Sequence, residues 1–241
     1  MAFTAASVML SVQTVLNDAT AVRWTAVELH TWLNDALREI AVLKPNAVAK
    51  TVELDLQQGA YQTLPEGHFA LFRLTRNLAT NAESATGRGG GRVITKVERE
   101  VMDMQISGWM DNAVMPYTKN VVHFIDDISD MAAYYVVPGN DGTGVVEAIC
   151  AVMPTLVPAP ETDTLMVSSY TSEVDISDIY RNAIIDYMLY RAFSKDASIA
   201  GIAQRAGVHY SQFANSLGLK FAAERLVSGE TVAPMGTVSN G

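Results

Sequence analysis

Hydrophobic residues recur with the period of a helix near both ends of the chain and with the period of a strand between them. Apolar positions within 8–16 and 29–40 predict two helices near the N-terminus. Thr25 and Glu28 have the spacing of a capping box, which places the start of the second helix. The helical period returns within 176–193 and 199–221 and predicts two long helices near the C-terminus. Helices are therefore expected from both chain ends.

The middle of the chain has the alternation of strands. Val52, Leu54 and Leu56 alternate with polar residues, as in a strand with one buried face. Similar runs follow at 61–64, 69–78, 93–97, 121–125, 131–137 and 145–153, and turn-forming residues such as those of 138–142 separate them. This pattern predicts a block of about six short strands.

Together these elements predict an α+β fold. We expect a four-helix bundle built from both chain ends, because neither helical pair can bury its apolar stripe alone. An antiparallel β-rich domain is inserted into it, and a flexible C-terminal tail follows. The predicted boundaries are 1–46 and 172–227 for the two halves of the bundle, 47–153 for the insert, 154–171 for a linker rich in proline, and 228–241 for the tail.

Composition narrows the classes of function. The chain has 241 residues and a formal net charge of −9, which disfavours binding to a nucleic-acid backbone by bulk electrostatics. Its apolar runs are far shorter than the ~20 residues that span a bilayer, and residues 1–10 lack the features of a signal peptide. The single cysteine, Cys150, excludes an intrachain disulfide framework and a zinc site built from cysteines. We expect folding in a reducing cytoplasm.

A glycine-rich segment, 87–92, is the first candidate for chemistry. It lacks the lysine and hydroxyl residues of a phosphate-binding P-loop. A mobile hairpin loop is the simpler interpretation. The alternative is a loop that lies close to DNA or to a partner chain, and the local cations Arg88, Arg92, Lys96 and Arg99 favour it.

No motif predicts catalysis. The acidic turn 126–130 lacks the twelve-position pattern of a calcium loop. The four histidines show no metalloprotease spacing, and no nucleophile elbow is present. Cys150 lies in an apolar strand and is expected to be buried and inert. The sequence therefore predicts no enzyme, no catalytic residue, no metal site and no cofactor.

Three segments carry a resemblance to a known family. Residues 178–196 read DIYRNAIIDYMLYRAFSKD, residues 209–218 read HYSQFANSLG, and residues 17–35 contain ND, RWT, EL and WLND in that order. Together they resemble tailed-bacteriophage head-to-tail adaptor proteins, also called connector or head-completion proteins, over about residues 5–226. The motif positions are Trp24, Trp32, Asp35, Tyr180, Asp186, Tyr187, Tyr190, Arg191, Lys195 and Asp196. The loop 81–92 and the C-terminal tail depart from the family pattern.

The resemblance implies a structural protein of the virion neck that is made in the host cytoplasm. Such a protein docks beneath the portal protein as a homo-oligomeric ring of about twelve copies. It extends the DNA channel and offers a surface to the tail or to the next neck protein. Double-stranded DNA passes through the lumen without sequence-specific binding, and no membrane is involved. The alternatives are another phage neck or tail structural protein, or a protein-binding module outside the virion.

Within this frame three roles are hypothesised. The apolar residues Val232, Pro234, Met235 and Val238 of the tail contact the portal or a neighbouring subunit. The β-rich insert supplies the surface that faces the tail. The charged residues near the corner of the C-terminal helices stabilise helix ends and subunit contacts; they are Asp186, Arg191, Lys195 and Asp196.

Overall fold

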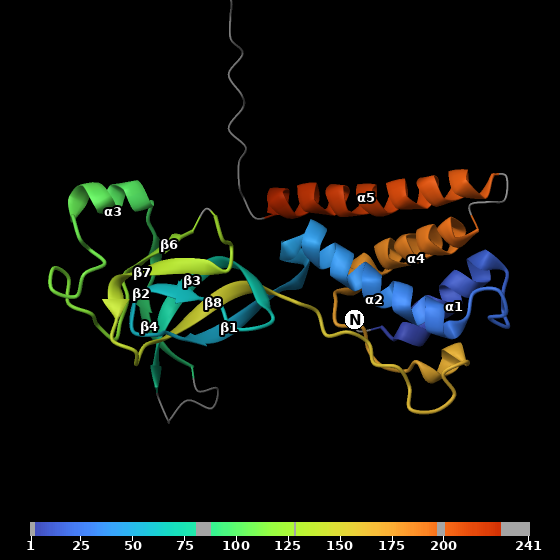
Figure 1. Cartoon of the computed structure of the whole chain (residues 1–241), viewed down its shortest axis with the longest axis horizontal. Helices are drawn as coiled ribbons and strands as arrows, with labels where there is room; N and C mark the ends of the chain where they lie inside the picture. Colours follow the sequence, from blue (N-terminus) through green and yellow to red (C-terminus); the bar gives the residue numbers. More distant parts are fainter. Residues whose placement is uncertain (1–2, 81–87, 128, 197–200, 228–241) are drawn as a thin grey trace, which may run out of the picture. The chain divides into compact units, whose positions relative to one another are not determined.

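The structure is a computed structural model that describes residues 3–80, 88–127, 129–196 and 201–227 (Figure 1). The chain divides into two compact units. Met1–Lys44 and Pro154–Gly241 form one, called here the helical unit, and Pro45–Met153 form the other, called the β unit. The predicted flexible tail, 228–241, lies outside the described residues.

Four helices belong to the helical unit: α1 (Ala5–Leu16), α2 (Ala26–Leu43), α4 (Arg181–Lys195) and α5 (Ile202–Val227). Thr4 caps α1 by accepting a hydrogen bond from the N–H of Ser7. At the start of α2, Thr25 and Glu28 form the predicted capping box, so two backbone N–H groups are satisfied reciprocally.

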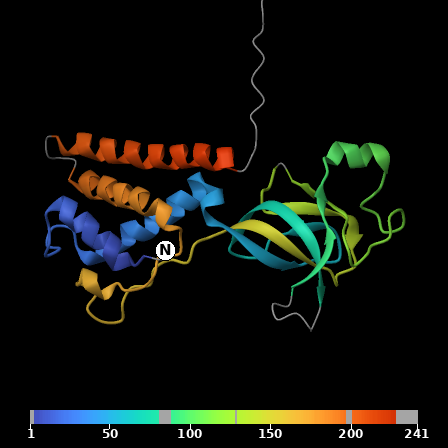
Figure 2. The same ribbon diagram turned by 180° about the vertical axis from the view of Figure 1, so that it is seen from behind.

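The prediction of a four-helix bundle is wrong. α4 is the common partner: α1 and α2 pack against it and against each other, and α5 also packs on α4. Figures 1 and 2 show α5 along the side of α4 that faces away from α1. Among the described side chains of α5, only Ala206, Phe213 and Leu217 are buried. α4 is apolar on several faces because α1 and α2 cover one side and α5 covers the other, and four helices do not enclose one shared core.

The connector between Pro154 and α4 is tied down by hydrogen bonds. It contains two short 3-10 helices, η2 (Val167–Ser169) and η3 (Asp178–Tyr180). The Asn34 side chain on α2 accepts from the N–H of Val157 at 2.9 Å and donates to its carbonyl oxygen at 3.0 Å. The ring of His30 also contacts this carbonyl oxygen, at 2.7 Å from Nε2. Asn34 thus satisfies the backbone of Val157 as a neighbouring strand would.

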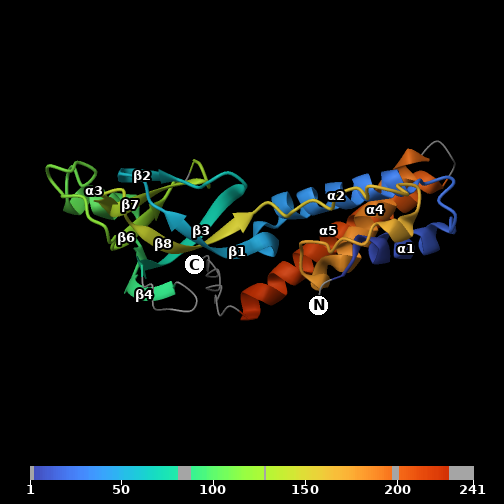
Figure 3. The ribbon, with the colours of Figure 1, turned by 90° about the horizontal axis from the view of Figure 1, so that it is seen from below.

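The β unit contains two four-stranded sheets in its described residues. One sheet has the order β1-β8-β3-β4, and the other β2-β7-β6-β5. Figure 3 labels all of these strands except β5. The strands are β1 (Ala49–Asp55), β2 (Gly59–Thr63), β3 (His68–Thr80), β4 (Arg88–Val93), β5 (Thr95–Lys96), β6 (His123–Asp126), β7 (Ala133–Asn140) and β8 (Val145–Val152). A one-turn 3-10 helix, η1 (Pro45–Val48), precedes them, and α3 (Arg99–Gln105) follows β5.

Strand pairing is antiparallel except between β5 and β6, which run parallel. The first and last strands of the unit, β1 and β8, are neighbours, and Ala49 is the register partner of Ala151. The main core includes Leu74, Phe124, Tyr134 and Val146, all nearly inaccessible to solvent. Strands from both sheets contribute to it, so the sheets bury their apolar faces against each other.

A buried asparagine joins three segments of the β unit. Asn77 on β3 donates to the carbonyl oxygens of Arg92 and Val121, at 3.0 and 2.8 Å. Its side-chain oxygen accepts from the N–H of Val121 at 2.8 Å. The side chain is 2 % exposed, so these bonds replace water almost completely.

Candidate functional site

Hydrogen bonds and ion pairs gather at the corner where the loop before α2 meets the end of α4. The Asp18 carboxylate accepts from the N–H groups of Val22, Arg23 and Trp24, at 3.0–3.1 Å. The bond from Trp24 contributes most to lowering the pKa of Asp18 below its ordinary value. This loop therefore sets where the Trp24 side chain lies.

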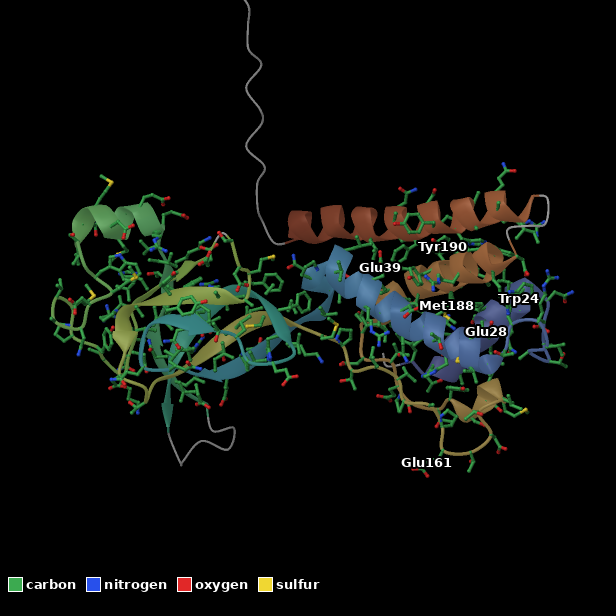
Figure 4. The ribbon with its side chains drawn as sticks, in the orientation of Figure 1. Trp24, Glu28, Glu39, Glu161, Met188 and Tyr190 are labelled. Carbon is green, nitrogen blue, oxygen red and sulfur yellow. The ribbon has the colours of Figure 1, made fainter. Side chains whose placement is uncertain are left out.

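Three contacts then join α2 and the loop before it to the end of α4. Trp24 donates from Nε1 to the carbonyl oxygen of Ala192 at 3.2 Å. Lys195 Nζ lies 2.6 Å from Glu28 Oε1, and Arg23 Nε lies 2.9 Å from Asp196 Oδ2. Figure 4 shows Trp24 and Glu28 together at this end of α2. We call these contacts the corner clamp.

The charge state of Glu28 reflects this arrangement. Partial burial acts to raise the pKa of its carboxyl group. Hydrogen bonds from Lys195 and Thr25 outweigh that effect, so the pKa is lowered. Glu28 is thus held ionised by the corner clamp.

Two further motif residues, Arg191 of α4 and Tyr180 just before it, contact α2 and the residue that follows it. Arg191 lies 3.6 Å from Asp35, which also accepts from Arg38 at 3.2 Å. At the other end of α4, the ring of Tyr180 is buried beneath the ammonium group of Lys44, 5.5 Å from the ring centroid. Trp32 on α2 is buried as well. These positions join helices within one chain.

The contact between α4 and α5 is aromatic. The ring centroids of Tyr187 and Phe213 are 5.2 Å apart, and those of Tyr190 and Tyr210 are 5.0 Å apart. His209 Nδ1 lies 3.0 Å from Asp186 Oδ1. Figure 4 shows Tyr190 on the α4 side of this contact. We call the aromatic and polar residues together the α4–α5 seam.

The structure gives all four predicted charged residues partners within the chain. Asp186 pairs with His209, and Arg191 pairs with Asp35. Lys195 and Asp196 belong to the corner clamp. Their contribution to helix packing is therefore visible in the monomer, whereas subunit contacts by these residues remain a prediction.

Two of the four cations expected near DNA or a partner form ion pairs within the chain. Lys96 on β5 pairs with Asp126 at 2.9 Å. Arg99 begins α3 and pairs with Asp103 at 3.7 Å, with its guanidinium over the ring of Tyr135. Arg88 and Arg92 both lie on β4, where the side chain of Arg92 is exposed.

Candidate metal ligands do not gather in the part of the chain that the structure describes. No cluster of three or more His, Cys, Asp or Glu side chains suited to a metal ion is found there. Cys150 is buried in β8, and burial raises the pKa of its thiol to about 11. None of the described helices is long and apolar enough to cross a membrane.

Sequence patterns missed an apolar groove on the helical unit. It is lined by Leu10 and Gln13 of α1, by residues 19–21 and by residues 165–168 of the connector. Leu10 lies beside the buried stripe of α1, and the connector has no regular period, so periodicity gives no signal there. The predicted contact residues of the tail, Val232, Pro234, Met235 and Val238, lie outside the described residues.

The family model described as SU10 adaptor protein matches residues 3–235, which is nearly the whole chain. No curated protein matches the chain significantly.

Proposed function

Because the chain belongs to the SU10 adaptor protein family, a family of structural bacteriophage proteins, we propose that it is a head-to-tail adaptor of the virion neck. It docks beneath the portal protein as a ring of about twelve copies and extends the DNA channel. The ring also offers the attachment surface for the tail or the next neck protein. The observation that carries this proposal is the family match over residues 3–235.

The helical unit supports the proposal through the location of the family motifs. Motif residues of α2, of the loop before it and of α4 form the corner clamp and the contacts along α4, which hold the helices of one chain together. They therefore maintain a fold, as expected for a protein whose work is assembly. In contrast, most described side chains of α5 stay exposed outside the α4–α5 seam and are available for contacts between copies.

The β unit suits the role of a variable attachment surface. Its two sheets bury a core of their own, so its loops can differ without disturbing the helices. We assign it to the surface that receives the tail. A net charge of −9 also agrees with a channel that passes DNA without holding it, since tight phosphate contacts would oppose ejection.

Electron microscopy of the protein mixed with DNA-filled, tailless heads of its virus tests the proposal. Ring-shaped density added below the portal would establish the adaptor role and give the number of copies directly. Bare heads beside folded, monomeric protein would contradict it and favour a tail component or a binding module outside the neck. Crosslinks from residues 45–153 to the portal, instead of to the tail, would contradict the assignment of the β unit.

A further inference from the structure

The groove on the helical unit has the properties of a peptide site. Its volume is about 280 Å³, and none of the residues that line it is charged. Leu10, Leu165 and Met166 form apolar walls and are 49 %, 72 % and 59 % exposed. Apolar side chains exposed together around a concave surface are typical of an interaction site.

A buried amide lies at the floor of this groove. Gln13 is 5 % exposed and is one of the lining residues. Its backbone carbonyl accepts bonds at the end of α1, but its side-chain amide has no hydrogen-bond partner among the described residues. Among the described residues, every side-chain nitrogen or oxygen atom that is fully enclosed has a hydrogen-bond partner. The amide of Gln13 has none, so it is not fully enclosed. It therefore reaches solvent through the groove that Gln13 lines.

This combination defines the chemistry of a ligand. A glutamine amide has both a donor and an acceptor, and together these match the N–H and C=O groups of a peptide backbone. The surrounding apolar walls favour uncharged, apolar side chains, and a charged side chain would lose hydration there without a partner. The groove thus fits an extended, uncharged peptide segment.

We propose that the groove binds residues 231–238 from the C-terminal segment of a second copy of this chain. No charged residue occurs after Glu230, and Val232, Met235 and Val238 supply apolar side chains. Pro234 favours an extended backbone. The inference rests on the proposed ring and names a contact between its neighbouring subunits.

The geometry of α5 explains why the segment comes from a second copy. α5 begins at Ile202, six residues after Asp196 of the corner clamp. Its Leu217 carbonyl oxygen lies 3.5 Å from Nζ of Lys44, which follows the other end of α2. α5 then continues to Val227, away from α1 (Figure 1). The groove includes residues 19–21, in the loop that leads to Trp24 of the corner clamp. From the helix rise, Val227 lies roughly 38 Å along α5 from Ile202, so it is at the end of α5 far from the corner clamp. A chain from Val227 to Val232 spans at most about 18 Å, so the chain's own segment does not reach.

Binding of a synthetic peptide to the full-length protein tests this contact. The probe is a fluorescein-labelled peptide of residues 228–241, and its anisotropy is measured as protein is added. We expect saturable binding. Gln13→Met, which keeps the side-chain length but removes the amide, should weaken binding at least about tenfold, the loss of one well-formed hydrogen bond in a dry site. Met166→Glu should weaken it further.

Val42→Glu is the matched control. Val42 is an apolar residue of α2 that is 68 % exposed and lies outside the groove lining, so the same substitution there should leave binding unchanged. Circular dichroism and thermal unfolding verify that each variant is folded. If Gln13→Met fails to fold, Met166→Glu on the exposed connector still decides the result. Absence of binding up to about 1 mM peptide, or binding that no groove variant weakens, overturns the inference.

The outcome separates this contact from the proposed function. Rings on heads together with no peptide binding would refute the groove contact and leave the adaptor role intact. Peptide binding that depends on Gln13, together with bare heads, would support the contact and refute the adaptor role. If the peptide binds purified portal protein but not this chain, the C-terminal segment binds the portal protein and not the groove, and the inference is wrong.

Discussion

The indole Nε1–H of Trp24 donates to the carbonyl oxygen of Ala192 at 3.2 Å and thereby ties the start of α2 to the last turn of α4. Trp24 is 7 % exposed, so water does not replace this bond if it is lost. Trp24→Phe should lower the free energy of unfolding by about 1–3 kcal/mol, mainly because the carbonyl is left unpaired. Trp24→Ala should cost about 3–5 kcal/mol. Chemical denaturation of both variants measures these losses, and a Trp24→Phe variant as stable as the original chain would show that the bond contributes nothing.

The Glu28–Lys195 pair should make stability depend on acidic pH. The pKa of Glu28 is lower in the folded chain than its ordinary value of 4.5, so the folded state prefers the ionised carboxylate. The stabilisation is complete above pH 4.5 and is lost as the pH falls through the lowered pKa. Glu28→Gln should cost at most about 1 kcal/mol at pH 7, because both side chains are partly exposed to solvent. The cost should shrink at acid pH, and a cost independent of pH would contradict the role of the charge.

The α4–α5 seam should control the attachment of α5. Phe213 is fully buried against Tyr187, whereas Tyr210 in the same seam is 42 % exposed. Phe213→Ala should cost about 3–5 kcal/mol and release α5 before the rest of the helical unit. Hydrogen exchange should then rise in residues 202–217 while α2 stays protected. Tyr210→Ala serves as the control and should cost less than half as much. Uniform loss of protection would contradict a separate opening of α5.

Asn77 should be essential to the β unit. Its side chain supplies three hydrogen bonds in a site that excludes water. Asn77→Ala leaves the backbone groups of Val121 and the carbonyl of Arg92 without this partner, which should cost about 2–5 kcal/mol. Thr51→Ala on the exposed side of β1 is a control expected to change stability by less than about 0.5 kcal/mol. Thermal unfolding compares the two, and similar midpoints would refute the role of Asn77.

The Cys150 thiol should be unreactive in the native state. It is buried, and its pKa is raised to about 11, so little thiolate exists at pH 8 and reagents do not reach it. Titration with a thiol-reactive disulfide should give no rapid reaction in buffer and one equivalent in denaturant. Rapid labelling of folded protein would show that β8 opens readily.

Local patterns predicted elements better than their assembly. The capping box of Thr25 and Glu28 was predicted correctly because its spacing is a property of one helix end. The prediction of a four-helix bundle was wrong because other helices can pack on an apolar helix such as α4 in several arrangements. Periodicity shows that α4 is buried on several faces, but it does not show which helices pack on each face. Contacts such as Arg191 to Asp35 join residues far apart in sequence, and no local signal predicts such a pair.

The candidate groove could not be predicted from the sequence for a similar reason. Gln13 sits in an ordinary helical segment, and its importance depends on the absence of a partner in three dimensions. Leu165 and Met166 belong to a connector whose apolar residues follow neither helical nor strand periodicity, so the sequence does not predict whether they are buried or exposed. The family resemblance was available from the sequence because motif residues such as Trp24 and Tyr187 occur in a recognisable order, and the family match over residues 3–235 confirms it.

The pairing of Ala49 with Ala151 has a consequence for how this protein can be altered. Register partners on adjacent antiparallel strands lie about 5 Å apart, so the chain enters and leaves the β unit at almost one point. The β unit is therefore an insertion whose two ends are adjacent in space. Another domain with adjacent termini can replace residues 45–153 without moving the ends of the flanking helical segments. The β unit can likewise be inserted into a surface loop of an unrelated protein.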